Sequence, residues 1–186
     1  QEGRDNLYAQ SKKEIRNLLS KWADESNNAF TGMIIPNVFG PFCRPNYNSV
    51  VATFCHQLTH QQSPKIDNDS ELKLIYVAEL VREIIKVIDE KISDHNYEVS
   101  YTALIKVSEI RSLLEEFTSG YLESGIIPPI HQEFNLNLFN TYRSYIDLKT
   151  RYPFKFTQFT DPRGSFAEVI RLNVGGQVSF STTVPD

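Results

Sequence analysis

The hydrophobic pattern of this 186-residue chain changes its period once, near residue 150, and this change limits the possible folds. Before it, apolar residues recur every three or four positions, as in helices that bury one face. After Tyr152, polar and apolar residues alternate between glycines and prolines, which is typical of antiparallel strands. The pattern predicts α/β units over residues 1–150 and an all-β segment over 151–186, which is too short to bury a core alone.

Within residues 1–150, the periodicity predicts five helices and three short strands. The helices are expected near residues 6–26, 50–58, 77–88, 108–117 and 134–148. The strands are expected near residues 33–35, 72–77 and 95–101, and the first of them reads as a buried parallel strand. Ser108 is the expected N-cap of the fourth helix. The face of the first helix that we expect to be buried carries Ile15, Leu18, Leu19 and Trp22.

Charge and cysteine content argue against several classes of function. The net charge is -4 and no Lys/Arg run is present, so we expect no nucleic-acid partner. No apolar stretch approaches the roughly 20 residues of a membrane span, and no signal peptide is evident. Two cysteines, Cys43 and Cys55, are too few for a disulfide scaffold and favour the cytoplasm. Because the chain begins at Gln1 and its one methionine is Met33, we expect a piece of a longer protein.

Tyr8 and Lys12 are the first candidate catalytic pair. Residues four apart share a helix face, so the ammonium can stabilise a phenolate and let the tyrosine exchange a proton with a substrate oxygen. The spacing alone decides little, because about half a Tyr-x-x-x-Lys match is expected by chance in such a chain. A second match, Tyr145 and Lys149, comes late in a predicted helix, whereas Tyr8 and Lys12 begin a helix that leads into a strand.

The loop "CRPNYNS" is the second candidate. It carries Arg44, Asn46, Tyr47 and Asn48 just after a predicted strand and its loop. Arginine suits a diphosphate, asparagine suits sugar hydroxyls, and a tyrosine ring can stack on a ring of a ligand. The alternative is a polar connection that caps the next helix through Asn48 or Ser49.

Other candidates are weaker. His56 and His60 are four residues apart, but Gln57 replaces the glutamate of a His-Glu-x-x-His helix and no third ligand is evident, so no metal is expected there. Neither cysteine has an apparent partner that would make it a nucleophile. Tyr142 and Tyr145 are expected to pack in the core.

A Tyr-x-x-x-Lys helix followed by a strand and the loop "PNVFGP" resembles the extended short-chain dehydrogenase/reductases that act on nucleotide sugars. The resemblance implies that Tyr8 is the catalytic acid and base. It implies that Lys12 binds the nicotinamide ribose and activates Tyr8. It also places Pro36, Asn37 and Val38 against the nicotinamide, and Asn37 against the substrate.

The segments "CRPNYNSVVATFCH", "YVAELV", "DPRGSF" and "GQVSFS" are similar to the capsular-polysaccharide UDP-sugar reductases, which join such a dehydrogenase to a C-terminal cupin. This resemblance covers essentially the whole chain. It implies a Rossmann-type α/β part followed by the first strands of a cupin barrel. The implied activity is reduction of a UDP-linked 2-acetamido-2,6-dideoxyhexulose by NADPH, with Arg44, Asn46, Tyr47 and Asn48 at the substrate and zinc possible in the cupin. A homodimer is expected on other grounds, because the β-segment is too short to bury its own apolar face and a partner chain would cover it.

The departures from this pattern leave alternatives open. Ile34 occupies a position that is often arginine in nucleotide-sugar members, and no Gly-x-x-Gly-x-x-Gly or Gly-x-Gly-x-x-Gly run occurs. The Ser/Thr partner of the tyrosine would lie before Gln1, and the cupin histidines after Asp186. The alternatives are an epimerase or dehydratase of the same family, or a truncated relative that acts through protein contacts without catalysis.

Overall fold

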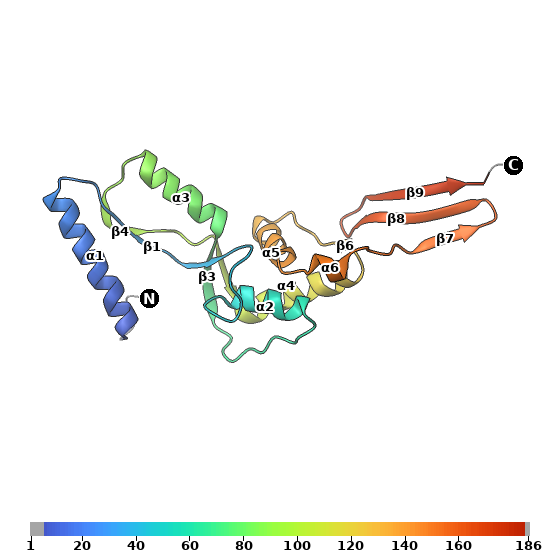
Figure 1. Ribbon diagram of the computed structural model, residues 1–186, viewed down its shortest axis with the longest axis horizontal. Helices are drawn as coiled ribbons and strands as arrows, with labels where there is room; N and C mark the ends of the chain where they lie inside the picture. Colours follow the sequence, from blue (N-terminus) through green and yellow to red (C-terminus); the bar gives the residue numbers. More distant parts are fainter. Residues whose placement is uncertain (1–5, 185–186) are drawn as a thin grey trace. The chain divides into compact units, whose positions relative to one another are not determined.

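A computed structural model describes residues 6–184 of the chain, and Figure 1 labels most of its elements. These residues form two compact units, one from residues 6–38 and 75–101, the other from 39–74 and 102–184. Strands β2 (Asn37–Phe39) and β3 (Glu71–Tyr76) cross from one unit to the other along the sequence. The domain boundary near residue 151 concerns the complete protein and stays a prediction.

The first unit is built on two parallel strands, β1 (Thr31–Ile34) and β4 (Asp94–Glu98). Thr31 pairs with Asp94 and Ile34 with Glu98, with a register irregularity between them. The parallel strand that the sequence predicts is therefore present, and so is the short strand near residue 95. The predicted burial of the first strand is wrong, because Ile34 is 45% exposed and Ile35, just after the strand, is 42% exposed. Helix α1 (Leu7–Glu25) precedes β1, and α3 (Val77–Asp89) precedes β4.

Successive residues of β1 point to opposite faces, and each face has its own helix. On one face Gly32 approaches α1: a Cβ atom at Gly32 would lie 2.4 Å from the carbonyl oxygen of His95 and 3.1 Å from Cδ of Arg16. On the other face Met33 packs against a buried cluster that includes Leu80 of α3. This alternation is the period of two that a strand imposes, and it holds α1 close to the strands.

The expected buried face of α1 is wrong. Ile15, Leu18 and Trp22 are 50%, 67% and 61% exposed, and Leu19 is exposed as well. The buried residues of this helix are instead the small Ala9 and Ala23. The spacing correctly shows that the bulky apolar residues share a face, but the side of α1 toward the strands carries the buried Ala9 and Ala23 and the side chain of Arg16, which approaches Gly32. That side packs on the strands and leaves the apolar stripe outside.

The second unit is mainly helical. Its helices are α2 (Val50–Thr59), α4 (Val107–Phe117), the π-helical segment η1 (Thr118–Glu123), α5 (Glu133–Arg143) and α6 (Leu148–Arg151). Its core consists of side chains with almost no exposed surface, which include Val51, Cys55, Ile110, Leu114, Leu138 and Tyr142. Strand β3 pairs antiparallel with β5 (Ala103–Lys106), a strand that the sequence pattern did not reveal, and β3 lies between β5 and β2.

Two helix ends differ from the expectation. Helix α4 begins at Val107, one residue before the expected cap, and Ser108 lies inside it. The N–H and hydroxyl of Ser108 both donate to the carboxylate of Asp69, each at 2.8 Å, so a residue distant in sequence satisfies this helix end. The helix expected over residues 134–148 ends at Arg143, and α6 follows as a separate turn.

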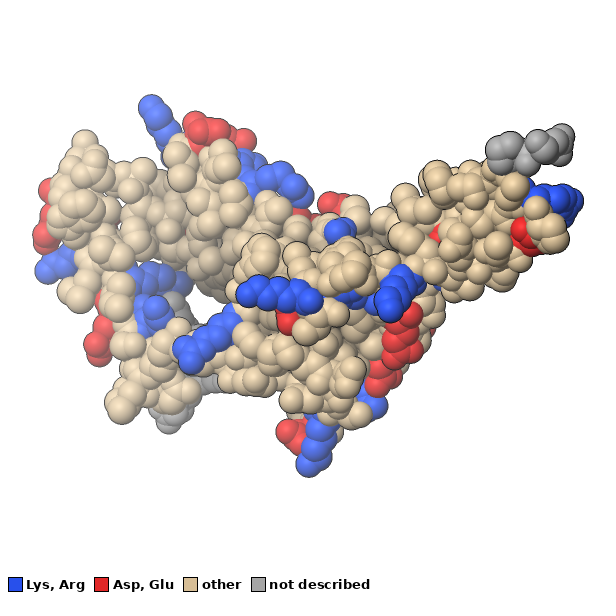
Figure 2. Space-filling model, turned by 45° about the vertical axis from the view of Figure 1, so that its right-hand side comes forward, with Lys and Arg blue, Asp and Glu red and all other residues tan. Residues whose placement is uncertain are grey.

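The alternating segment does form strands. β7 (Gln158–Asp161), β8 (Gly164–Leu172) and β9 (Gln177–Thr183) are antiparallel neighbours, with β8 between the other two. A short β6 (Ile126–Ile127) adds to the far end of β8 in parallel. The face seen in Figure 2 carries few charges along this sheet, in keeping with a β9 sequence that holds no charged residue. These described strands form an open sheet, so the cupin barrel stays a prediction.

Among the helices of residues 6–184, none combines the length and apolarity that crossing a bilayer requires.

Replacing Gly32 by alanine is expected to lower the free energy of unfolding by about 1–3 kcal/mol, because the new methyl group collides with backbone at His95. Thermal and urea unfolding measure the change. Gly120→Ala is the matched control, since its Cβ would have no neighbour closer than 3.9 Å. Equal stability of the two variants would contradict the close approach of the β4 backbone to β1 at Gly32.

Candidate functional site

Tyr8 and Lys12 lie together on the first turns of α1. The side chain of Asn6 caps this helix by accepting a hydrogen bond from the Ala9 N–H at 2.8 Å. The Lys12 Nζ atom lies 5.5 Å from the centroid of the Tyr8 ring, and Tyr8 is 56% exposed. The pair that the sequence suggested thus shares one face, open to a ligand.

The direction of α1 follows from its contacts with β4. Ser20 Oγ lies 2.6 Å from Nδ1 of His95, and one turn earlier Arg16 donates to the side chain of Asn96 at 2.9 Å. The earlier residue of α1, Arg16, thus contacts the later residue of β4, Asn96. The helix runs antiparallel to the strands, and its first turns lie toward the carboxyl ends of β1 and β4.

The segment after β1 lies at the same end of this unit. With a rise of about 1.5 Å per helical residue, Tyr8 is about 12 Å beyond Arg16. Gly32 lies beside the side chain of Arg16, so the two residues mark the same level of the unit. With a rise of about 3.3 Å per strand residue, Asn37 lies up to about 16 Å beyond Gly32 along the direction of β1. Tyr8, Lys12 and residues 36–38 therefore all lie toward the carboxyl edge of parallel strands, where open α/β sheets bind ligands.

The donors at this edge fit part of a nicotinamide cofactor. The phenol of Tyr8, the ammonium of Lys12 and the side chain of Asn37 offer hydrogen-bonding groups suited to a ribose and a carboxamide. The glycine-rich turn that would bind the pyrophosphate of the cofactor is not found among the described residues. Between residues 6 and 184, no helix begins at a glycine, since the N-caps are Asn, Ser, Tyr, Lys, Phe, Gln and Asp. The described residues thus fit the nicotinamide end and lack a glycine-rich cradle for the pyrophosphate.

The predicted substrate loop belongs to the second unit. Arg44 and Tyr47 are exposed, and the guanidinium carbon lies 5.6 Å from the centroid of the tyrosine ring. Asn46 adopts a left-handed φ of 55°, and its N–H donates to Thr53 Oγ1 at 3.0 Å. Asn48 is exposed as well. The structure therefore gathers the four predicted residues on one surface turn.

Ser49 caps the following helix, as one of the alternatives proposed. Its side chain accepts a hydrogen bond from the Ala52 N–H at 3.2 Å. Capping thus accounts for Ser49, while Arg44, Tyr47 and Asn48 remain exposed side chains without a capping role.

Residues that follow α5 hydrogen-bond to the backbone of this loop and fix its position. The N–H of Phe42 donates to Ser144 Oγ at 3.2 Å, and the phenol of Tyr145 donates to the Cys43 carbonyl at 2.5 Å. Burial raises the pKa of the Tyr145 phenol, which keeps it a protonated donor. Since α5 ends at Arg143 and Lys149 lies on α6, the second Tyr-x-x-x-Lys match does not share a helix. Sequence reasoning missed this anchoring role, which no local pattern signals.

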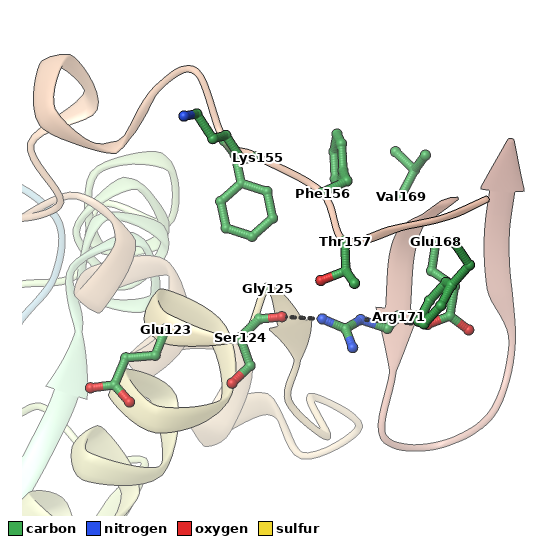
Figure 3. A pocket seen from close by; sticks show the side chains of 11 residues that line it. Glu123, Ser124, Gly125, Lys155, Phe156, Thr157, Glu168, Val169 and Arg171 are labelled. Carbon is green, nitrogen blue, oxygen red and sulfur yellow. Dashed lines mark hydrogen bonds and ion pairs between the residues drawn. The ribbon is translucent and has the colours of Figure 1, made fainter. Parts of the chain in front are cut away.

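One cavity of about 280 Å³ lies away from all predicted site residues (Figure 3). Arg171 of β8 donates to the carbonyl of Ser124 across it and lies 3.9 Å from the carboxylate of Glu168. The lining also includes Glu123 and Lys155. Two cations and two carboxylates thus offset one another, and Arg171 is already bonded within the fold.

The histidine pair and the cysteines do not form a second site. The rings of His56 and His60 are 4.0 Å apart, and His60 Nδ1 lies 2.8 Å from the carbonyl oxygen of His56. Burial, and then the charge of His60, lower the pKa of His56. Within residues 6–184, no group of three or more His, Cys, Asp or Glu side chains is placed to hold a metal. Burial raises the pKa of the Cys55 thiol, which makes it a poor nucleophile.

Residues 3–100 match the model of the NAD dependent epimerase/dehydratase family. The match covers more than half of the chain, which belongs to this family. The parallel β1–β4 pair with its flanking helices is the corresponding part of a Rossmann-like fold.

Two relatives carry more detailed names. The chain is 33% identical over 183 residues to a UDP-2-acetamido-2,6-beta-L-arabino-hexul-4-ose reductase of Pseudomonas aeruginosa, covering 97% of this chain and 49% of the reductase. A crystal structure of the capsular polysaccharide assembling protein CapF from Staphylococcus aureus superposes with a TM-score of 0.84 at 33% identity, over 99% of this chain and 50% of CapF. The chain thus spans about half the length of these relatives.

A UDP-glucose 4-epimerase from Thermotoga maritima shares the fold at a TM-score of 0.58 and 19% identity, over 74% of this chain and 52% of the epimerase.

Replacing Tyr145 by phenylalanine is expected to lower the free energy of unfolding by about 1–3 kcal/mol, because the Cys43 carbonyl loses its donor. Amide hydrogen exchange over residues 41–48 should become faster. Tyr47→Phe is the matched control on the same loop, since that ring is 72% exposed. Unchanged exchange in Tyr145→Phe would show that this bond does not hold the loop.

Proposed function

We propose that this chain supplies the catalytic helix and the substrate-binding part of an NADPH-dependent reductase. Its substrate would be a UDP-linked 2-acetamido-2,6-dideoxyhexulose, a precursor of capsular or other surface polysaccharide. Membership of the epimerase/dehydratase family and the likeness to a named UDP-sugar reductase support this. The observation that carries it is the exposed Tyr8–Lys12 pair directed toward the carboxyl edge of β1 and β4.

Tyr8 is the proposed proton donor. Reduction of a carbonyl carbon places negative charge on its oxygen, and the phenol O–H of Tyr8 would donate its proton to that oxygen. The phenolate that remains is stabilised by the Lys12 ammonium, which lies next to the ring. The pair therefore supplies the proton and the charge that favours its release.

NADPH, when bound, supplies the hydride for this reduction. Lys12 and Tyr8 would hydrogen-bond its nicotinamide ribose, and Pro36, Asn37 and Val38 would lie against the nicotinamide and the substrate. The glycine-rich turn that the pyrophosphate needs is not found in residues 6–184, so other residues of the complete protein would supply it.

The loop of Arg44, Asn46, Tyr47 and Asn48 is the proposed contact with the nucleotide sugar. Its side chains are exposed while its backbone is fixed by Ser144 and Tyr145. A fixed backbone with exposed polar groups reduces the entropy lost when a ligand binds.

Epimerisation or dehydration of a UDP-sugar is the second candidate, favoured by the family description itself. Both reactions would use the same tyrosine and the same cofactor, but neither oxidises NADPH in net terms. A truncated, non-catalytic relative is the third candidate, favoured by the exposed apolar stripe of α1. Continuous consumption of NADPH with a UDP-keto-sugar therefore favours the reductase.

In the complete protein, Tyr8→Phe is expected to lower kcat by about 10²- to 10⁴-fold, because the ring remains but the proton donor is lost. UDP affinity should stay close to that of the wild type. Absorbance of NADPH at saturating substrate follows the turnover, and Tyr101→Phe serves as the control outside the proposed site. Wild-type turnover in Tyr8→Phe would refute the assignment.

Lys12→Met is expected to slow turnover and raise the KM for NADPH together, since one ammonium would serve both the phenolate and the ribose. Lys13→Met is the matched control. It removes the same charge from the same helix, about 100° further around its axis. Similar kinetics in the two variants would show that only the general charge of α1 matters.

A further inference from the structure

A second cavity, of about 360 Å³, is lined in part by Pro41 and Phe42, which directly precede the proposed substrate loop. Every residue of its lining belongs to the second unit. The loop contributes Pro41 and Phe42, η1 contributes Tyr121, and the remaining walls come from α5, α6 and their junction. Those walls consist of Asn140, Arg143, Ser144, Ile146, Leu148, Arg151 and Tyr152.

The charge of this lining is entirely positive. It holds two guanidinium groups, Arg143 and Arg151, and no carboxylate. Neither arginine forms an ion pair within residues 6–184. The cavity of Figure 3 differs in this respect, because its two cations are matched by two carboxylates. An unneutralised pair of guanidinium groups in a concave surface favours a ligand with more than one negative charge.

Both guanidinium groups lie near aromatic rings. Arg143 lies 6.0 Å from the Tyr121 ring centroid, and Arg151 lies 4.4 Å from that of Phe154. Arg151 also donates to the Tyr121 carbonyl at 3.0 Å. A guanidinium has five N–H donors, so this bond leaves most of them for a ligand.

The cavity also offers apolar surface for a ring. Phe42 is 84% exposed and holds a left-handed φ of 62°, which turns the loop at this point. Tyr152, which directly follows α6, also lines the cavity and is exposed. Phe42 is only two residues from Arg44, so the cavity and the proposed substrate loop are separated by at most about 7.6 Å between Cα atoms.

We propose that this cavity binds the nucleoside diphosphate end of the nucleotide sugar, with Arg143 and Arg151 on the two phosphates and Phe42 or Tyr152 against the base. The proposal rests on the proposed function, since it assigns part of the same substrate. It adds two residues outside the "RPNYNS" loop. Arg44 then contacts the portion of the ligand nearer the sugar.

The test is calorimetric binding of UDP and UMP to the complete protein and its variants. Arg143→Gln is expected to weaken UDP binding at least about tenfold, because a charge-assisted contact to a phosphate is lost. UMP, which lacks the second phosphate, should bind the wild type more weakly and lose less. Arg151→Lys keeps the positive charge but loses the planar guanidinium, which can donate two parallel hydrogen bonds to a phosphate. This variant should therefore also weaken UDP binding.

Lys149→Gln is the matched control. It removes one positive charge from α6, the helix of Arg151, at a residue outside the lining, and it should change UDP affinity less than about twofold. Thermal unfolding of each variant verifies that it is folded. Protection of residues 41–42 and 143–152 from hydrogen exchange by UDP gives a second reading, independent of the substitutions.

The outcomes separate this inference from the proposed function. If Arg143→Gln binds UDP like the wild type while the protein still reduces a UDP-keto-sugar, the cavity is wrong and the reductase stands. If the variant loses NADPH affinity instead, the cavity has been assigned to the wrong nucleotide. If the wild type neither binds UDP nor reduces a UDP-sugar, both proposals fail.

Discussion

The space left by Gly32 is the constraint on which the first unit depends. Because no Cβ is present, the backbone of β4 at His95 and the side chain of Arg16 both reach β1, and α1 lies directly on the strands. Two side-chain contacts, from Ser20 and Arg16, then fix the direction of the helix. The position of Tyr8 and Lys12 follows from this packing, since a rigid helix transmits it to its first turns.

The sequence predicted those features that local chemistry determines. Ser49, one of the two caps that the alternative interpretation of the loop proposed, does cap α2, and an i, i+4 spacing was enough to place Tyr8 beside Lys12. The alternating pattern after Tyr152 correctly indicated antiparallel strands. In each case the partners are a few residues apart, or the period belongs to one element.

Features that depend on distant partners were missed. The stripe of Leu18 and Trp22 identifies a helix face without saying what covers it. The start of α4 depends on Asp69, which lies 39 residues before Ser108. Tyr145 anchors the Cys43 carbonyl, 102 residues away, so a residue that matched a catalytic spacing proved to hold the proposed substrate loop. The arginines of the second cavity come together only when α5, α6 and the loop are folded.

The central claim is that Tyr8 and Lys12 serve the net reduction of a UDP-keto-sugar. Mass spectrometry of the product formed from NADPH that carries deuterium at its transferable position tests this most directly. The account predicts a UDP-deoxysugar with one deuterium on the former carbonyl carbon and one equivalent of oxidised cofactor. A product isomeric with the substrate, without deuterium and without consumption of NADPH, would contradict it.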